Sequence, residues 1–329
     1  MRALAVKADN QKRVKVSQIY GDYLIMLAAP CIVAWRYYGA RALLVIAVSV
    51  LTAELCDLLA CLALGRKFLL KDLSNIFIGA AIALMMPAGI PLYVPASAAA
   101  FAVLAAKIPF GGSLKAPFVP SAAGFAFASV CFKELVFDYS YNSSGKLLGA
   151  RSLGDLLANG NSVHLNALNT FDILSGNVAG PMGTGCGILM LGCCAYLFVR
   201  RRNALLSTAG FIAACVIFSI IFPRINASPL TSAVLELSSG SLLFAAVFLL
   251  TDYSTQPDGG VYKIISGALC GIFCMIMRYV GVYEETVCFA VLLTNGISPV
   301  LGSAMAKNPL RASKKASQKS SAPSRAENK

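Results

Sequence analysis

The sequence carries very little charge for its length. Only 13% of its 329 residues are Asp, Glu, Lys or Arg, whereas roughly a quarter are charged in an ordinary soluble domain. Long windows such as 43–64, 77–106 and 204–222 contain no Lys or Arg. This scarcity excludes an ordinary soluble domain. Together with 57% hydrophobic residues and a mean hydropathy of +0.71, it predicts an all-α polytopic membrane protein.

Two familiar kinds of motif are also missing. Residues 1–18 are polar and basic and lack the apolar core of a cleavable signal peptide, so the first hydrophobic helix must target the chain. The eleven cysteines lie in or beside the apolar windows without CxxC spacing, so we interpret them as small membrane residues rather than disulfides or metal ligands. The single histidine, His164, lies in a polar loop and is expected to be a surface residue.

The apolar windows predict about ten membrane-spanning helices. Their expected ranges are 21–36, 41–64, 73–90, 91–108, 117–132, 181–199, 204–222, 234–251, 261–280 and 285–302. An even number of spans puts both termini on one side of the membrane. The expected order along the chain is an N-terminal segment (1–20), a five-helix half (21–132), a long loop (133–180), a second five-helix half (181–302) and a basic tail (303–329).

The basic residues indicate the orientation of these helices. In the ten-helix arrangement, 21 of the 28 Lys and Arg residues fall on one side and 7 on the other. The positive-inside rule then places both termini in the cytoplasm of a multi-pass protein in the plasma (inner) membrane. The tail is interpreted as disordered, and either attracted to anionic lipid headgroups or simply solvated. Because the charge is mostly a topology signal, we expect the lipid bilayer as a partner and no nucleic acid.

The two halves share a weak pattern. Phe110-Gly111-Gly112 and the later Val119-Pro120-Ser121 correspond to Tyr279-Val280-Gly281 and Ser298-Pro299-Val300, at offsets of 169 and 179 residues. Five helices per copy would make this a 5+5 inverted repeat, an architecture that holds ligands near the interface of its halves. Chance similarity between apolar helices is the alternative.

The loop at 133–180 is far longer than the other expected connections. Its Ser, Asn and Gly residues indicate a polar segment outside the membrane. An extracytoplasmic function would have to be built there.

Polar side chains within the expected helices are candidates for an ion path. Glu54 and Asp57 are three residues apart and therefore share one face of the second helix, and Asn295 lies in the tenth. Charges at such depth are costly and face a cavity or a partner. The alternative is that Glu54 and Asp57 lie near an interface and pair with water or with an Arg of a neighbouring helix.

Several segments together resemble the D-type membrane protein of Rnf-type ion-translocating ferredoxin:NAD oxidoreductases and the related B-type membrane protein of sodium-pumping NADH:quinone reductases. They are DILSGNVAG at 172–180, FLLTD at 248–252, RYVGVYE at 278–284 and FAVLLTN at 289–295. The resemblance covers most of residues 10–302. It implies a membrane subunit of a complex that couples ferredoxin/NAD electron transfer to Na⁺ or H⁺ translocation, with other Rnf-like subunits as partners.

The resemblance also implies flavins. Such proteins carry FMN joined by a phosphoester to a Thr of the outside loop, and riboflavin between helices. Here the attachment motif reads Leu148-Gly149-Ala150-Arg151-Ser152-Leu153, so Arg151, which has no hydroxyl, replaces the Thr. The guanidinium of Arg151, next to Ser152, is still suited to bind a flavin phosphate, and a loop without flavin is the alternative. Ile78 and Val119 replace polar family residues, which predicts weaker riboflavin binding.

Thr251 and Asp252 end the eighth expected helix, where the resemblance is strongest. They either contact a cofactor or simply end the helix at the membrane interface. Three functions remain open at this point. The first is the electron-transport subunit; the others are a small-solute transporter or channel, and a non-redox assembly subunit of the same fold.

Overall fold

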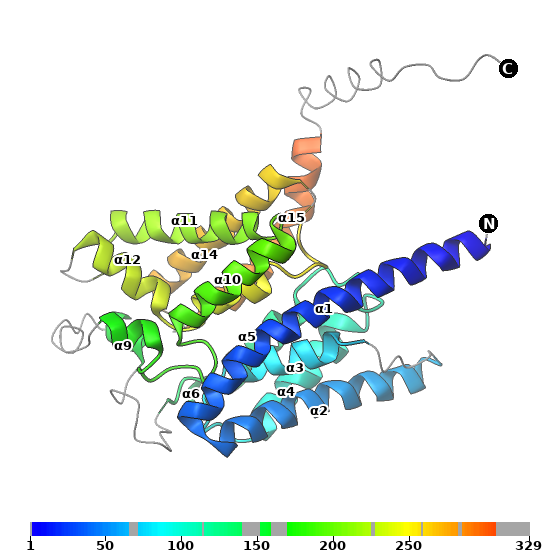
Figure 1. Ribbon diagram of the computed structural model, residues 1–329, viewed down its shortest axis with the longest axis horizontal. Coiled ribbons are helices and arrows are strands. Elements are labelled where there is room, and N and C mark those ends of the chain that lie inside the picture. The colour runs from blue at the N-terminus through cyan, green and yellow to red at the C-terminus, as the bar shows by residue number, and fades with distance from the viewer. Residues whose placement is uncertain are drawn as a thin grey trace, which may run out of the picture.

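The computed structural model describes residues 2–65, 72–113, 115–139, 152–158, 170–224, 228–257, 259–281 and 285–306. Figure 1 shows two groups of helices, one from each half of the chain, with the long α1 lying between them. The helices of the first half are α1 (Arg2–Tyr38), α2 (Ala40–Ala63), α3 (Ser74–Leu84), α4 (Tyr93–Phe101), the π-helix η1 (Ala102–Lys107) and α5 (Pro120–Cys131).

The second half begins after a connection whose described parts include the short helices α6 (Lys133–Val136), α7 (Leu153–Ala158) and α9 (Thr170–Ser175). It consists of α10 (Gly187–Arg201), α11 (Leu205–Ile221), α12 (Pro229–Ser238), α13 (Leu242–Phe244), the π-helix η2 (Ala245–Leu249), α14 (Gly260–Val280) and α15 (Val287–Ala306). Leucines of α7 pack with Ile173 and Leu235 in a small apolar cluster of their own, so the described parts of the long loop are folded against α12.

Each range in which the sequence predicts a span contains a helix, but the lengths differ from the prediction. In the described part of the chain, three helices are long and apolar enough to cross a membrane: the Ser17–Tyr38 part of α1, α2 and α14. A fourth candidate is the pair α12 and α13–η2, which is bent by 73°. Five further apolar helices among the described residues are shorter.

Three boundaries differ from the sequence prediction for identifiable reasons. Helix α1 starts at Arg2 rather than near residue 21, because the Lys, Ala and Gln residues of the 2–20 segment favour a helix. Helix α3 ends at Leu84, shortly before Pro87, whose ring disfavours helical backbone in the preceding residue. The expected eighth span breaks between Ser238 and Leu242, where Gly240 has a φ of 65°.

Close helix packing depends on glycine. A Cβ on Gly267 of α14 would lie 2.0 Å from the backbone oxygen of Ser207 in α11, and one on Gly210 would lie 2.3 Å from that of Ile264. Gly267 and Gly271 form a GxxxG pattern, which lets membrane helices approach at backbone distance. Gly79 of α3 is equally close to α2, with Val50 Cα 2.7 Å from its ideal Cβ.

Two short, buried helices, α3 and α13–η2, run in opposite directions. Because each is too short to cross a membrane alone, we call them the half-helices. Near the start of α3, the ring of Phe77 lies 6.4 Å from that of Phe248 near the end of η2. Near the end of α3, Met85 contacts Cys288, at a sulfur–sulfur distance of 3.9 Å. The last carbonyls of α3 accept hydrogen bonds from the 181–186 segment, with Gly183 N donating to Leu84 O at 2.9 Å.

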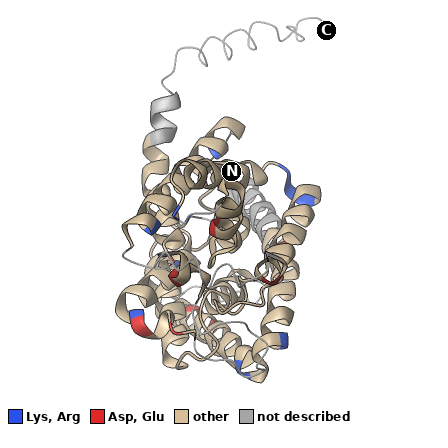
Figure 2. Cartoon of the chain, turned by 90° about the vertical axis from the view of Figure 1, so that its left-hand side faces the viewer, with Lys and Arg blue, Asp and Glu red and all other residues tan. Residues whose placement is uncertain are grey.

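The outer surface is apolar. Leu51, Leu55, Leu59 and Leu62 of α2 are 56–69% exposed and follow one face of the helix. Figure 2 shows how few charged residues the body of the molecule carries. Such a surface suits hydrocarbon rather than water, which agrees with the membrane class predicted from the sequence.

Candidate functional site

A partly buried group of charged and polar residues surrounds the start of α3. We call it the Lys107 cluster; its members are Glu54, Asp57, Asp72, Asn75 and Lys107. The Lys107 ammonium lies 3.0 Å from the Asp72 carboxylate and 3.7 Å from that of Asp57. It also donates to the amide oxygen of Asn75. The side chain of Lys107 is only 2% exposed. A single ammonium therefore joins η1, α2 and the beginning of α3.

The carboxylates of this cluster outnumber its cations three to one. The amide nitrogen of Asn75 donates to Asp57 at 3.0 Å and to Glu54 at 3.3 Å, so one amide lies between two carboxylates. Burial opposes ionisation of Asp72. The Lys107 ammonium and the hydrogen bonds from Ser74 nevertheless hold the pKa of this carboxyl below its usual value. The cluster thus places several acceptor oxygens around one ammonium.

The sequence prediction for Glu54 and Asp57 can now be compared with their positions. They do share a face of α2, since both accept from the same amide. Asp57 pairs with a Lys of a neighbouring helix rather than with an Arg. Asn295 is not brought to them and lies in a different pocket.

A second buried group lies at the break before α13. We call it the Arg278 cluster; its members are Arg224, Glu236, Ser239, Ser241, Arg278 and Glu285. The Arg278 guanidinium donates to the Glu236 carboxylate at 3.1 Å and to the carbonyl of Ser239 at 3.1 Å. Arg224 lies 3.4 Å from the other oxygen of Glu236. The side chains of Arg278 and Glu236 are 3% and 1% exposed.

Glu285 completes the Arg278 cluster by capping the second half-helix. Its carboxylate accepts from the backbone N–H of Ser241 at 2.9 Å and from the Ser241 hydroxyl at 2.6 Å. A Cβ at Gly240 would lie 1.6 Å from Glu285 Oε1, so only glycine admits this carboxylate. Two carboxylates thus face two guanidiniums, and this cluster is balanced in charge.

Thr251 and Asp252 lie at the end of η2, against α1. The hydroxyl of Tyr23 donates to the backbone oxygen of Thr251 and lies 3.1 Å from its side-chain oxygen. Tyr23 also accepts a hydrogen bond of 2.9 Å from Arg201. Both Thr251 and Asp252 are buried and bonded within the protein, as residues that end a helix are.

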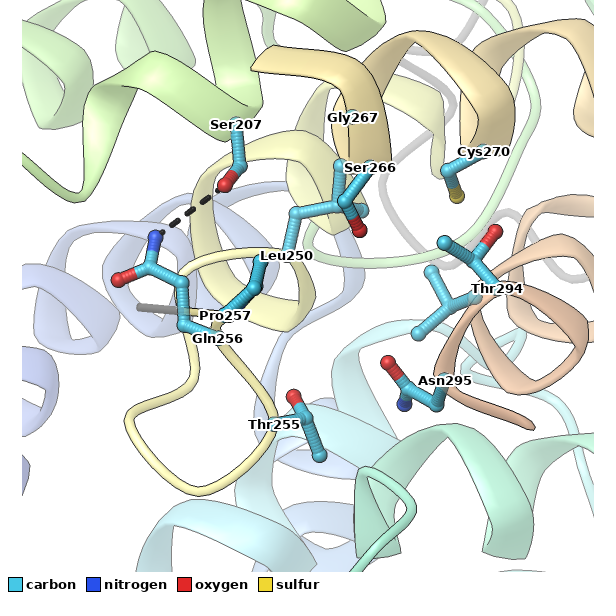
Figure 3. Close-up of a pocket in the computed structure, with 11 residues that line it drawn as sticks. Ser207, Leu250, Thr255, Gln256, Pro257, Ser266, Gly267, Cys270, Thr294 and Asn295 are labelled. Carbon is cyan, nitrogen blue, oxygen red and sulfur yellow. Dashed lines mark hydrogen bonds between the residues drawn. The ribbon is translucent and has the colours of Figure 1, made fainter. Parts of the chain in front are cut away.

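A small polar pocket lies between α11, α14 and α15 (Figure 3). Ser207, Thr255, Gln256, Ser266, Thr294 and Asn295 give it oxygen and amide groups. Gln256 is held by Ser207 at 3.4 Å and by Lys263 at 2.9 Å. The buried amide nitrogen of Asn295 has no hydrogen-bond partner among the described residues.

The flavin-loop residues are only partly described. Arg151 and His164 lie outside the described residues. Ser152 is 4% exposed, and its hydroxyl accepts from the N–H of Asp155 at 3.1 Å, as an N-cap of α7. It also lines a small hollow with Gly180, Ser238 and Gly240.

Most members of the two clusters were missed by sequence reasoning. Lys107, Arg278 and Asp72 were not predicted as site residues: the two basic residues counted toward topology, and Arg278 also lies in the matching segment RYVGVYE. The available signal was their position: each basic residue ends an apolar helix and is followed within a few residues by a glycine.

These features define a class: a helical membrane protein with two central half-helices, each starting at a buried cluster of charges. Comparison with known sequences narrows the class. The chain belongs to the NQR2, RnfD, RnfE family, whose model matches residues 5–311. The family predicted from the sequence segments is thereby confirmed.

Individual relatives match along most of the chain. The chain is 24% identical over 301 residues to the D-type subunit of the Na(+)-translocating ferredoxin:NAD(+) oxidoreductase complex of Acetobacterium woodii, covering 91% of this chain and 92% of the relative. It is 27% identical over 285 residues to the D-type subunit of the ion-translocating oxidoreductase complex of Pseudomonas paraeruginosa, covering 80% and 83%. The B-type subunit of a Na(+)-translocating NADH-quinone reductase of Neisseria meningitidis is 28% identical over 236 residues, covering 66% and 56%.

Proposed function

We propose that the chain is the D-type membrane subunit of an ion-translocating oxidoreductase complex in the plasma membrane. The observation that carries the proposal is the Lys107 cluster, a buried charge network inside a membrane protein whose relatives are subunits of ion-translocating complexes. The partners of the chain are the other subunits of that complex. Its ten spans form a 5+5 inverted repeat with both termini in the cytoplasm.

Matching contacts in the two halves support the repeat. Ser113, just after α4–η1, donates to Ser74 at the start of α3 at 2.7 Å. Glu285, just after α14, likewise binds Ser241 at the start of α13. Lys107 and Arg278 are 171 residues apart, and Ser74 and Ser241 are 167 apart. Equivalent contacts at a near-constant offset are what two copies of one unit produce.

The ion path in this proposal begins at Glu54 and Asp57. Among the described residues, three carboxylates around one ammonium leave two negative charges, which two protons, or one Na⁺ ion and one proton, would balance. Asn295 supplies a second polar site along the proposed ion path, because its amide faces a pocket of neutral oxygens between α14 and α15.

The chain is proposed to work without covalently bound FMN. Arg151 replaces the attachment Thr, and a guanidinium cannot form the phosphoester. The neighbouring hydroxyl of Ser152 is buried as the cap of α7 and does not fit the role of a substitute. A noncovalent flavin phosphate would therefore rely on the charge of Arg151. Thr251 and Asp252, bonded to α1, are proposed to end η2 rather than to bind riboflavin.

Purification from native membranes tests the assignment. An affinity-tagged chain is expected to bring down iron–sulfur and flavin-binding subunits, while its own band shows no flavin fluorescence on a denaturing gel. Glu54→Gln or Asp57→Asn should lower ion uptake by vesicles containing the complex without changing the recovery of its subunits. Glu134→Gln, at an exposed carboxylate of α6, is the matched control. Recovery of the chain without partners would overturn the proposal.

Because the attachment Thr is missing, two other functions are alternatives to the electron-transport subunit. A small-solute transporter would take up solute in proteoliposomes that contain the chain alone and no electron donor. A non-redox assembly subunit would bring down its partners, but Glu54→Gln and Asp57→Asn would leave ion uptake unchanged.

A further inference from the structure

We propose that Lys107 and Arg278 are paired latches that hold the two half-helices at opposite faces of the membrane, and that the Lys107 latch is the one that opens. The inference rests on the proposed inverted repeat and names the face at which an ion enters. In this proposal the ion enters at the Lys107 cluster, at the start of α3. The Arg278 cluster, at the start of α13, stays closed.

The two basic residues occupy corresponding places. Lys107 is the last residue of η1, and Arg278 lies in the last turn of α14. Each reaches back to the segment that precedes a half-helix, Lys107 to Asp72 and Arg278 to Ser239. Each also meets charged residues from other elements of its half. For Lys107 these include Asp57 of α2, and for Arg278 they include the Arg224–Glu236 pair beside the end of α11.

The bonds of the two latches differ in number and in exposure. Arg278 is held by a carboxylate and by the carbonyls of both Glu236 and Ser239, all buried. Lys107 is held by side chains alone, and one of them, the Asp72 carboxylate, is 37% exposed. A planar guanidinium that bonds backbone carbonyls is more firmly oriented than an ammonium on a flexible stem. Water can thus compete at the Lys107 latch.

The charges around the two latches also favour opening of the Lys107 latch. Lys107 faces Asp57 and Glu54 from α2 and Asp72 and Asn75 from the α3 side, so it can leave one carboxylate for another. Arg278 faces Glu236 and Glu285, which Arg224 helps to neutralise. The first arrangement has alternative pairings of similar kind. The second sets two guanidiniums against two carboxylates among the described residues, with Glu236 paired to both Arg224 and Arg278.

The start of α3 contacts the end of η2 through side chains. Phe77, in the first turn of α3, stacks on Tyr23 at 5.3 Å and lies beside Phe248 of η2. Tyr23 in turn bonds Thr251 at the end of η2. These are side-chain contacts, so release of the start of α3 leaves in place the backbone hydrogen bonds of η2 and the bonds that hold the start of α13.

Hydrogen exchange on the intact complex tests the latches. In the wild-type complex, backbone amides of α3 are expected to exchange about tenfold faster than those of α13–η2, as a less stable local unit does. Lys107→Met should speed exchange in α3 and leave α13–η2 unchanged, while Lys107→Arg should preserve protection. Arg278→Met should speed exchange in α13–η2. It should also allow a maleimide to modify Cys274, which lies one turn before Arg278 and is 0% exposed.

Equal exchange of the two half-helices in the wild-type complex would overturn the proposal, and this comparison needs no variant to fold. Loss of protection in both half-helices on Lys107→Met would also overturn it. The proposed function fails separately, if Glu54→Gln leaves ion uptake unchanged while α3 and α13–η2 still differ in exchange. Lys115→Met, at an exposed lysine, is the control for loss of a positive charge.

Discussion

The hydroxyl of Tyr20 donates a hydrogen bond of 3.2 Å to the carboxylate of Asp252, 232 residues further along the chain. This bond ties α1 to the end of the second half-helix. Its acceptor is buried, with the N–H of Ser254 and the charge of Arg201 as the other groups that favour its ionised form. Burial outweighs them and raises the pKa of Asp252 to about 6.

The raised pKa of Asp252 predicts a pH-dependent stability. Between about pH 4 and pH 6 the folded protein holds a proton on Asp252 that the unfolded chain has lost, so stability falls as pH rises through this window. The full cost of ionisation, about 3 kcal/mol, is present above pH 6. Asp252→Asn should reduce the change of the thermal-unfolding midpoint with pH across this window, measured on detergent-purified protein. Glu134→Gln should leave that pH dependence as in wild type. Parallel pH profiles for Asp252→Asn and wild type would contradict the prediction.

Local composition accounts for what the sequence could predict. Apolar windows can be identified directly from the sequence, so the positions of the helices could be predicted. The shared face of Glu54 and Asp57 could be predicted from their spacing. The partners of these carboxylates could not, because Lys107 joins them only after η1 packs against α2 and α3. Likewise, the bend at Gly240 depends on Glu285, which arrives from 45 residues away.

Gly240 is predicted to be irreplaceable. Alanine would place its Cβ 1.6 Å from Glu285 Oε1 and would adopt an unfavourable positive φ. We expect Gly240→Ala to cost more than about 3 kcal/mol, seen as lost thermal stability and lower yield of purified protein. Gly281→Ala also has a positive φ but meets nothing within 4 Å, so it should cost only about 1 kcal/mol. Similar losses for the two variants would show that backbone strain alone matters at Gly240.

The contact between α11 and α14 gives a second glycine prediction. A Cβ at Gly267 would lie 2.0 Å from Ser207 O, so Gly267→Ala must force the helices apart. We expect a loss of about 3 kcal/mol in thermal stability. Gly192→Ala in α10 meets nothing within 4 Å and should be neutral or stabilising by about 0.5–1 kcal/mol. A neutral Gly267→Ala would mean that α11 and α14 are not packed at backbone distance in the membrane.

Arg151→Thr restores the hydroxyl that the family motif uses and tests how much of the flavin site survives. A phosphoester needs an oxygen nucleophile, which Arg151 lacks, and Ser152 uses its own oxygen to cap α7. Expressed in cells with a flavin transferase, Arg151→Thr should gain flavin on the peptide that contains residue 151, measured by mass spectrometry and in-gel fluorescence. Wild type and Arg151→Ala should gain none. If Arg151→Thr stays unmodified while another flavoprotein in the same cells is modified, then Leu148, Ser152 and their neighbours have diverged beyond recognition by the transferase. The loss of covalent flavin would then belong to the whole loop rather than to one side chain.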